Sequence, residues 1–385
     1  MMRPALASSL LLMVLALAAC SGSTDAPAAS SPPVAPAATT TADPAAPPAP
    51  APAPAPTACD LETAALQKGL DGAHAKTTGA ALAVKNTACG ARTLVSGPTH
   101  IEANNLHRIG SVTKTFTAAV ILSLAKDGVL GLDDKLSKWV PDVTGGDAIT
   151  LRQLLDHQSG LFNYTEDTAF LQSPKNTVYT PRQLVDIALR NPVYFAPGTS
   201  WHYSNTNFIL LGMIAETAGQ AKLATLIRTR VLEKVGLTAT FFDGEEPVVG
   251  TLAPAQDARG GDATKVLDPS WAWAAGSIVA TPGDLAVWIE KVGSGAFYDA
   301  AQQKELLTTV PTGTPSVDYG LGIIVFGAAI TGNAGPGIGH DGSIAGYHTQ
   351  SFYFPDKKTT IVSIVDSDAD DPNTVTIAAL DVLFK

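Results

Sequence analysis

Residues 108–116 read RIGSVTKTF and begin a helical pattern that extends from Ser111 to Lys126, just before Gly128. Residues three apart face the same side of a helix, so Lys114 is expected one turn beyond Ser111. A serine hydroxyl is a weak nucleophile until a base takes its proton, and a lysine at this spacing can contact it. Free N–H groups and the dipole at a helix N-terminus also favour developing negative charge. The stretch therefore indicates a nucleophilic serine with a base on the same helix.

The same Ser-x-x-Lys spacing occurs a second time, at Ser123 and Lys126. Ser123 lies in the middle of the expected helix, where a serine hydroxyl commonly bonds to a preceding carbonyl. Ser111 instead follows Gly110 and opens the helix. We therefore interpret the second copy as a coincidence of sequence.

Two further short motifs occur once each in the chain, Tyr203-x-Asn205 and His340-x-Gly342. A tyrosine phenol can transfer a proton, and a nearby amide side chain can orient a substrate. A glycine beside a strand lets another backbone or a ligand approach closely. Each motif also has a purely structural interpretation: a packed tyrosine with Asn205 as a helix N-cap, and a glycine-rich turn with an exposed histidine.

Strand-like runs lie at both ends of the part of the chain that is expected to fold, with helical signals between them. The runs predict strands at 80–84, 93–96, 319–326, 347–354 and 359–365. Helices are expected at 60–74, 111–126, 205–218 and 373–383, with further helix starts at Thr180-Pro181 and Thr281-Pro282. This order predicts an α+β fold, in which helices flank an antiparallel sheet and an all-helical lobe is inserted between its strands.

Taken in order, the three motifs resemble those of the serine β-lactamase and penicillin-binding-protein superfamily. The resemblance is closest to its branch of D-alanyl-D-alanine carboxypeptidases, class C β-lactamases and related esterases, and it covers roughly residue 79 to the C-terminus. The flanking segments of that branch are matched by LLDHQSGL at 154–161, PG at 197–198, WAAGS at 273–277 and YGLG at 319–322. The resemblance implies a β-lactamase/transpeptidase-like fold with its active site between the sheet and the helical lobe.

The resemblance also implies how the proton transfers are divided. Ser111 attacks a carbonyl and forms an acyl-enzyme, while Lys114 and Tyr203 share the acid and base work. Which of these two takes the serine proton stays open at this point. We expect no cofactor, and the sequence contains no His-Glu-x-x-His or similar metal motif.

Substrate-binding roles follow from the same resemblance. Asn205 is expected to hold the amide of the substrate, and the third motif places His340 and Gly342 beside it. The backbone N–H groups of Ser111 and Ser343 are expected to form the oxyanion hole.

The third motif departs from the common pattern of the superfamily at two positions. His340 stands where many relatives carry lysine, and an ordinary histidine carries little charge at neutral pH. Asp341 places an acid where a small hydroxyl residue is usual, and no Lys or Arg occurs between Lys304 and Lys357. We therefore expect weak strict carboxypeptidase activity and better cleavage of esters or uncharged substrates. If His340 binds the carboxylate, cleavage of carboxylate substrates should improve toward about pH 6.

The expected function is that of a serine hydrolase acting through an acyl-enzyme on an amide or ester, such as a peptidoglycan peptide. Two alternatives stay open: a carboxylesterase of the same fold, and a non-catalytic penicillin-binding sensor that is acylated without turnover. A net charge of −10 argues against a nucleic-acid partner.

The N-terminus carries the features of a bacterial lipoprotein signal. Arg3 precedes an apolar stretch at 6–19, which is short for a membrane span and typical of a signal peptide. The stretch ends in LAAC, so we expect residues 1–19 to be removed and Cys20 to be lipidated. The protein would then be exported and anchored by lipid in the cell envelope, on the periplasmic or outer-membrane face.

The remaining chain divides into a linker and one domain. Residues 20–58 are rich in Ala, Pro, Ser and Thr and are expected to form a disordered tether. The hydrolase domain is expected at 59–385. With Cys20 lipidated, Cys59 and Cys89 are left as an even pair in an oxidising compartment, where a disulfide between them is possible.

Overall fold

The computed structural model describes residues 55–73, 79–98 and 100–385. The expected signal peptide, Cys20, His74 and most of the expected tether lie outside the described residues. Residues from Thr57 to Lys385 form one compact unit.

The unit contains strands at both chain ends and helices between them. The strands are β1 (Ala80–Asn86), β2 (Gly90–Ser96), β3 (His107–Arg108), β4 (Thr240–Phe242), β5 (Ile278–Ala280), β6 (Val310–Pro311), β7 (Val317–Tyr319), β8 (Ile324–Phe326), β9 (Gly337–Ile344), β10 (Tyr347–Phe354) and β11 (Thr359–Val365). The helices are α1 (Ala58–Ala73), α2 (Thr113–Lys126), α3 (Leu136–Trp139), α4 (Leu151–Leu155), α5 (Thr168–Gln172), α6 (Pro181–Leu189), α7 (Asn205–Gly219), α8 (Leu223–Ile227), α9 (Glu233–Val235), α10 (Pro282–Gly293), α11 (Ala300–Leu306), α12 (Ala328–Thr331) and α13 (Pro372–Phe384).

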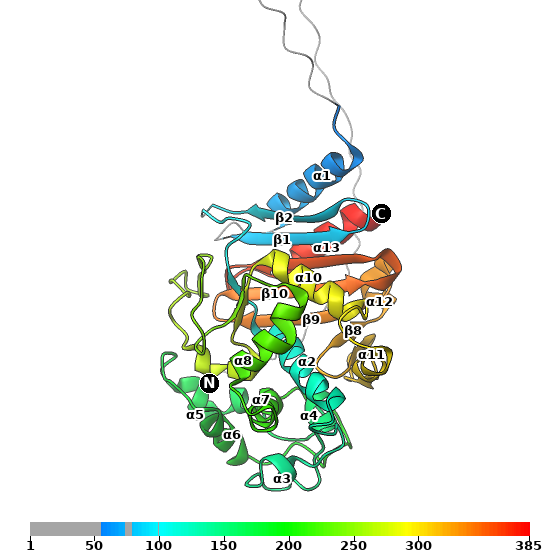
Figure 1. Ribbon diagram of the computed structural model, residues 1–385. Helices are drawn as coiled ribbons and strands as arrows, with labels where there is room; N and C mark the ends of the chain where they lie inside the picture. Colours follow the sequence, from blue (N-terminus) through cyan, green and yellow to red (C-terminus); the bar gives the residue numbers. More distant parts are fainter. Residues whose placement is uncertain (1–54, 74–78, 99) are drawn as a thin grey trace, which may run out of the picture. The chain divides into compact units, whose positions relative to one another are not determined.

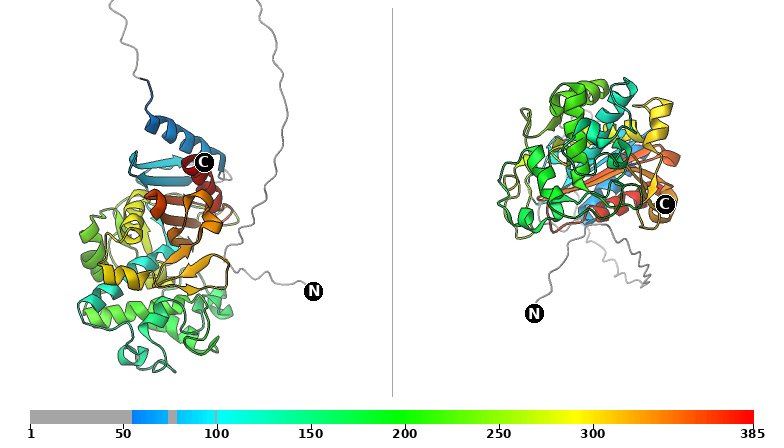
Figure 2. Two further views of the ribbon diagram at one scale, coloured as in Figure 1. Left: turned by 90° about the vertical axis from the view of Figure 1, so that its right-hand side faces the viewer. Right: turned by 90° about the horizontal axis from the view of Figure 1, so that it is seen from below.

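Eight strands form one antiparallel sheet in the order β2-β1-β11-β10-β9-β8-β7-β6. The two chain ends meet in it, because β1 pairs with β11 along its whole length. The strands β3, β5 and β4 form a small second sheet. Helices α1 and α13 pack together beside the large sheet, and Figure 1 shows the helical lobe of α2 to α8 beyond it. Figure 2 shows the same division from two other directions. The expected α+β fold with an inserted helical lobe is confirmed.

Helix α2 lies in the hydrophobic core of the unit, as its sequence predicts. Eleven of its 14 residues are buried, as expected for a helix that is apolar on all sides. Phe116 stacks on Trp288 of α10 at 4.6 Å between ring centroids, and the Trp288 indole donates to the hydroxyl of Thr115 at 2.7 Å. These contacts hold the start of α2 against the helix that covers the sheet.

Two expected elements differ from the structure. Ser111 lies in a 3₁₀ turn (Gly110–Val112) that leads into α2, rather than on its first α-helical residue. The strand expected at 319–326 is two strands, because Gly320 and Gly322 form a tight turn between β7 and β8. A side chain at Gly320 would meet the carbonyl oxygen of Leu306 at 2.2 Å, and Gly322 has φ +77°. The other expected strands and helices match the structure within a few residues.

A disulfide joins Cys59 of α1 to Cys89, which lies in the turn between β1 and β2, with Cα atoms 5.4 Å apart. It therefore links the first helix to the hairpin at the edge of the large sheet. Among the described residues, no helix is both long and apolar enough to cross a bilayer.

Candidate active site

The site lies where the free edge of β9 passes the turn that carries Ser111. Two glycines permit this approach. A Cβ atom at Gly342 would lie 2.0 Å from the carbonyl oxygen of Ile109 and 3.1 Å from the backbone nitrogen of Ser111. Gly110 has φ +50°, and a Cβ there would lie 2.7 Å from the nitrogen of Ser343. The glycine of the third motif is thus needed because two backbones touch at this point.

The N–H of Ser343 lies at this contact for a reason of strand register. Ile344 pairs with Tyr347 across a two-residue turn, so the next pair, Ser343 and His348, is of the kind that exchanges no backbone hydrogen bonds. The N–H of Ser343 therefore points away from β10. On that side, β8 pairs with β9 only as far as Gly339. A free strand N–H thus stands beside the Ser111 backbone, as an oxyanion hole requires.

The Ser111 hydroxyl accepts a hydrogen bond from the Lys114 amine at 2.9 Å, and the same amine donates to the carbonyl of Ala275 at 2.9 Å. The Lys114 side chain is 0% exposed. Burial lowers the pKa of Lys114 well below the usual value of a lysine, although the negative charge of Asp341 opposes this effect. A neutral amine beside the hydroxyl can accept its proton.

Tyr203 lies on the other side of the Lys114 amine, which is 4.8 Å from the centre of the Tyr203 ring. Burial raises the pKa of the Tyr203 phenol above its usual value, and a hydrogen bond with Ser111 opposes this rise only in part. The phenol is therefore protonated at neutral pH. These two pKa shifts favour Lys114 as the group that takes the serine proton.

His157 packs against Tyr203 and lies in the segment at 154–161. Its ring centre is 4.4 Å from that of Tyr203, and its backbone is left-handed with φ +64°. Its Nδ1 accepts the backbone N–H of Ser204 and faces the side-chain amide of Asn207, each at 3.2 Å. Burial lowers the pKa of His157 well below its usual value, so the ring is neutral.

Asn205 is the first residue of α7 rather than its N-cap, which is Ser204. Its side-chain amide donates to Thr165 at 3.1 Å and to Asn163 at 3.3 Å, and its backbone N–H donates to Asn163 at 3.0 Å. Sequence reasoning missed Asn163 and Thr165. The only sequence signal for them is their position shortly after the 154–161 segment.

His340 lies on β9 beside the site, but its side chain is buried rather than open to a substrate carboxylate. Its side chain is 0% exposed, and its Nε2 lies 2.8 Å from the hydroxyl of Tyr319 on β7. Burial, together with the nearby Lys114, lowers the pKa of His340 to about 3. The ring is therefore neutral at physiological pH and cannot supply charge to a substrate carboxylate. The prediction that His340 improves the cleavage of carboxylate substrates toward about pH 6 is therefore wrong.

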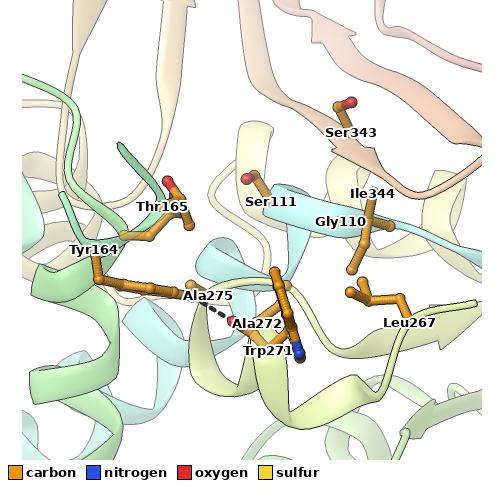
Figure 3. Close-up of a pocket in the computed structure, with 12 residues that line it drawn as sticks. Gly110, Ser111, Tyr164, Thr165, Leu267, Trp271, Ala272, Ala275, Ser343 and Ile344 are labelled. Atoms are coloured by element: carbon orange, nitrogen blue, oxygen red, sulfur yellow. Dashed lines mark hydrogen bonds between the residues drawn. The ribbon is translucent and has the colours of Figure 1, made fainter. Parts of the chain in front are cut away.

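A cavity of about 150 Å³ opens beside Ser111 (Figure 3). It is lined by Gly110, Ser111, Tyr164, Thr165, Asn205, Leu267, Trp271, Ala272, Ala275, Gly276, Ser343 and Ile344. No charged side chain is in this lining. Trp271 forms one wall together with Leu267 and Ile344. The Tyr164 hydroxyl fixes the Trp271 backbone with a 2.6 Å hydrogen bond.

The structure brings Ser111, Lys114, Tyr203, Asn205 and Ser343 to one place, although they come from both ends and the middle of the chain. Within the described residues there is no group of three or more His, Cys, Asp or Glu side chains that could hold a metal ion.

A mixed sheet-and-helix fold with a Ser-x-x-Lys nucleophile at the edge of its sheet defines the β-lactamase and transpeptidase class of acyl-transferring proteins. The chain belongs to the Beta-lactamase family, whose model matches residues 63–383.

Similar proteins fall in the same class. Penicillin-binding protein 4* of Bacillus subtilis is 24% identical over 287 residues, which are 70% of this chain and 62% of that protein. A D-aminopeptidase of Cereibacter sphaeroides is 29% identical over 279 residues, 68% of this chain and 50% of that protein. The chain thus spans half to under two thirds of the length of these relatives.

Two solved structures are similar over most of the chain. A D-stereospecific amidohydrolase from Streptomyces sp. has a TM-score of 0.73 and 30% identity, covering 82% of this chain and 98% of that one. D-amino acid amidase from Ochrobactrum anthropi SV3, complexed with L-phenylalanine, has a TM-score of 0.75 and 25% identity, covering 84% and 98%.

Proposed function

We propose that this protein is a serine hydrolase that cleaves amides of D-amino acids or short D-amino peptides through an acyl-enzyme on Ser111. The observation that carries the proposal is the 2.9 Å hydrogen bond between the Ser111 hydroxyl and the fully buried Lys114 amine. Burial depresses the pKa of that amine, so the resting site holds a nucleophile and a competent base in contact.

The reaction follows from these positions. The Lys114 amine takes the proton of Ser111 while the serine oxygen attacks the substrate carbonyl carbon. The resulting oxyanion accepts hydrogen bonds from the backbone N–H groups of Ser111 and Ser343. When the C–N bond breaks, the protonated phenol of Tyr203 donates a proton to the leaving nitrogen and recovers one from the Lys114 ammonium. Water then hydrolyses the ester on Ser111 by the same groups in reverse.

The substrate class rests on two supports. The similar solved structures are an amidohydrolase and an amidase that their names describe as acting on D-compounds. The cavity beside Ser111 is bounded by Trp271, Leu267 and Ile344 and by no charged side chain, which suits an apolar side chain of the substrate. Asn205 is in the lining of the same cavity, where its side chain can hold the substrate amide.

We expect purified protein to release ammonia from D-phenylalanine amide with steady turnover. The L-isomer should be slower by about tenfold or more, because a shaped apolar cavity discriminates by fit. The measurement is kcat/KM for both isomers. A single stoichiometric burst with no turnover would instead support the sensor alternative, and turnover of neutral esters but of neither amide would support the esterase.

We further propose that the mature protein is a lipoprotein of the cell envelope. The proposal rests on the LAAC sequence at 17–20, on the apolar stretch before it and on the Ala/Pro-rich segment after it. The disulfide between Cys59 and Cys89 is consistent with an oxidising compartment.

Replacing Cys20 with Ala is expected to stop lipidation of the protein, because the acyl chains would be attached to this cysteine. The acyl chains are the proposed anchor, and two chains are needed for stable membrane attachment. Mass spectrometry of the mature N-terminus is the check. An unmodified Cys20 in the mature wild-type protein contradicts the proposal, and Cys59→Ala serves as a control that should leave the lipid in place.

A further inference from the structure

A second cavity, of about 400 Å³, opens in the helical lobe between α5 and α6 (Figure 1) and shares no lining residue with the cavity beside Ser111. Its volume is that of a site for a small molecule. Helix α5 contributes Ala169 and Phe170 to this lobe cavity, the segment between the two helices contributes Tyr179, and α6 with its C-cap contributes the other lining residues. The proposed mechanism uses none of these side chains.

The polar side of the lobe cavity is one face of α6. Gln183, Ile187 and Arg190 share this face because residues three or four apart lie above one another on a helix, and Asp186 borders them. The side-chain oxygen of Gln183 is occupied in the helix cap, where it accepts the backbone N–H of Thr180 at 2.8 Å. Its NH₂ group is left as a donor for a ligand.

The charges around the lobe cavity leave one cation free. Asp186 is neutralised by Arg182, which donates to it at 2.8 Å. The carboxylate of Asp167 accepts from the side chain of Asn191 and from the backbone N–H of Phe170, each at 2.9 Å. Within residues 55–73, 79–98 and 100–385, no carboxylate forms an ion pair with Arg190. Its guanidinium is always charged, so it can bind an oxygen anion in the cavity.

The apolar side of the lobe cavity is aromatic. The rings of Phe170 and Tyr179 lie 5.4 Å apart between centroids, and their centroids are 4.2 Å and 5.7 Å from that of Trp271. Trp271 is a wall of the cavity beside Ser111. One layer of aromatic rings therefore lies between the two cavities, and a ligand in the lobe cavity would contact this layer from the side away from Ser111.

We propose that the lobe cavity is a second binding site, for a small acid that joins an aromatic or alkyl group to a carboxylate. The apolar group packs on Phe170, Tyr179 and Ile187, and the carboxylate accepts hydrogen bonds from Arg190 and Gln183. The site does not require the chemistry at Ser111. Hydrolysis of an uncharged amide produces a carboxylate, so an acid released by the proposed hydrolase belongs to this ligand class and its amide substrate does not.

The test compares two probes that differ only in charge, 3-phenylpropanoate and 3-phenylpropanamide. Calorimetry near neutral pH measures the Kd of each for the full-length wild-type protein. The acid should bind about fivefold or more tightly than the amide, because a charge-assisted hydrogen bond is stronger than a neutral one.

Two independent variants assign the binding to the lobe cavity. Arg190→Gln removes the cation and should weaken binding of the acid by about fivefold, with binding of the amide within about twofold of wild type. Ala169→Trp places a large ring in the cavity from an exposed position of α5 and should weaken binding of the acid by about tenfold or more, since the phenyl group loses its packing surface.

Matched controls make the same chemical changes elsewhere. Arg259→Gln lies at an exposed residue of a loop, and Ala65→Trp lies at an exposed residue of α1. Neither residue lines the lobe cavity, and both variants should bind the acid as wild type does. A thermal unfolding midpoint close to that of wild type shows that each variant is folded.

The results that would overturn the proposal are distinct. Equal affinity of wild type for acid and amide would remove the role of Arg190, and so would an equal loss of acid binding in Arg259→Gln. Acid binding that persists at full strength in folded Ala169→Trp would place the ligand outside the lobe cavity. Turnover is not measured in this test, so a failure of the proposed hydrolase function would leave the result unchanged.

Discussion

A Ser111→Ala variant is expected to lose covalent labelling by a fluorophosphonate or penicillin probe and to lose about 10³-fold or more in turnover of D-amino acid amides. The reason is chemical: the reaction requires an oxygen that can be deprotonated 2.9 Å from the Lys114 amine, and alanine has none. The substitution removes one partly buried hydroxyl, so the fold should survive, and an unchanged thermal unfolding midpoint would confirm this.

The second Ser-x-x-Lys copy provides a matched control. Ser123 lies in the same helix, where its hydroxyl accepts a 2.9 Å hydrogen bond from Arg230 and is far along the chain from the site. Ser123→Ala should therefore keep labelling and turnover within about threefold, as for most substitutions away from an active site. Equal labelling of a folded Ser111→Ala variant would falsify the assignment of the nucleophile.

Gly342→Ala is expected to lower kcat/KM by about 10²-fold or more, although it adds only a methyl group. That methyl would lie 2.0 Å from the Ile109 carbonyl oxygen, so either β9 or the Ser111 turn must move by about 1 Å. The movement separates the N–H groups of Ser111 and Ser343, which must converge on one oxyanion. We also expect a loss of about 1–3 kcal/mol in the free energy of unfolding, as is typical of overpacking.

Gly283→Ala is the control for this prediction. It lies in the first turn of α10, where the added methyl would have its nearest neighbour, the Thr93 hydroxyl, at 3.7 Å. Activity and stability should stay close to wild type, because that is an ordinary contact distance. If Gly342→Ala behaves in the same way, then β9 does not supply the second N–H of the oxyanion hole.

The pKa of His340 could not be predicted from the motif that contains it. The sequence places a histidine at the position where many relatives have lysine, and an isolated histidine would titrate near pH 6.5. Packing against Tyr319 and removal from water lower its pKa to about 3, so the side chain behaves as a neutral hydrogen-bonding group. Neither its burial nor its partner is encoded in the residues next to it, since Tyr319 lies 21 residues earlier on β7.

Local patterns were sufficient for much of the fold and for the chemistry of the site. Apolar periodicity and helix caps predicted α7, β10 and β11 nearly to the residue, together with the starts of α6 and α10 and the end of α2, because these signals act over a few neighbouring positions. The three ordered motifs predicted the family, and they predicted that Ser111, Lys114 and Tyr203 belong to one site. The prediction of one strand at 319–326 was wrong, because a glycine turn interrupts it. The backbone of this turn packs against the carbonyl of Leu306, and no local sequence pattern contains that contact.

The sequence alone therefore determined the order of the elements, the family and the candidate reacting side chains. The tertiary structure alone decided their ionisation and their neighbours. Lys114 has a depressed pKa because the fold buries it, and Asn205 is held by Asn163 and Thr165 because the start of α7 packs on the turn that contains them. Composition and spacing describe which groups are available along the chain. Burial and contacts between distant segments set the dielectric environment and the hydrogen-bond partners, and these govern what each group can do.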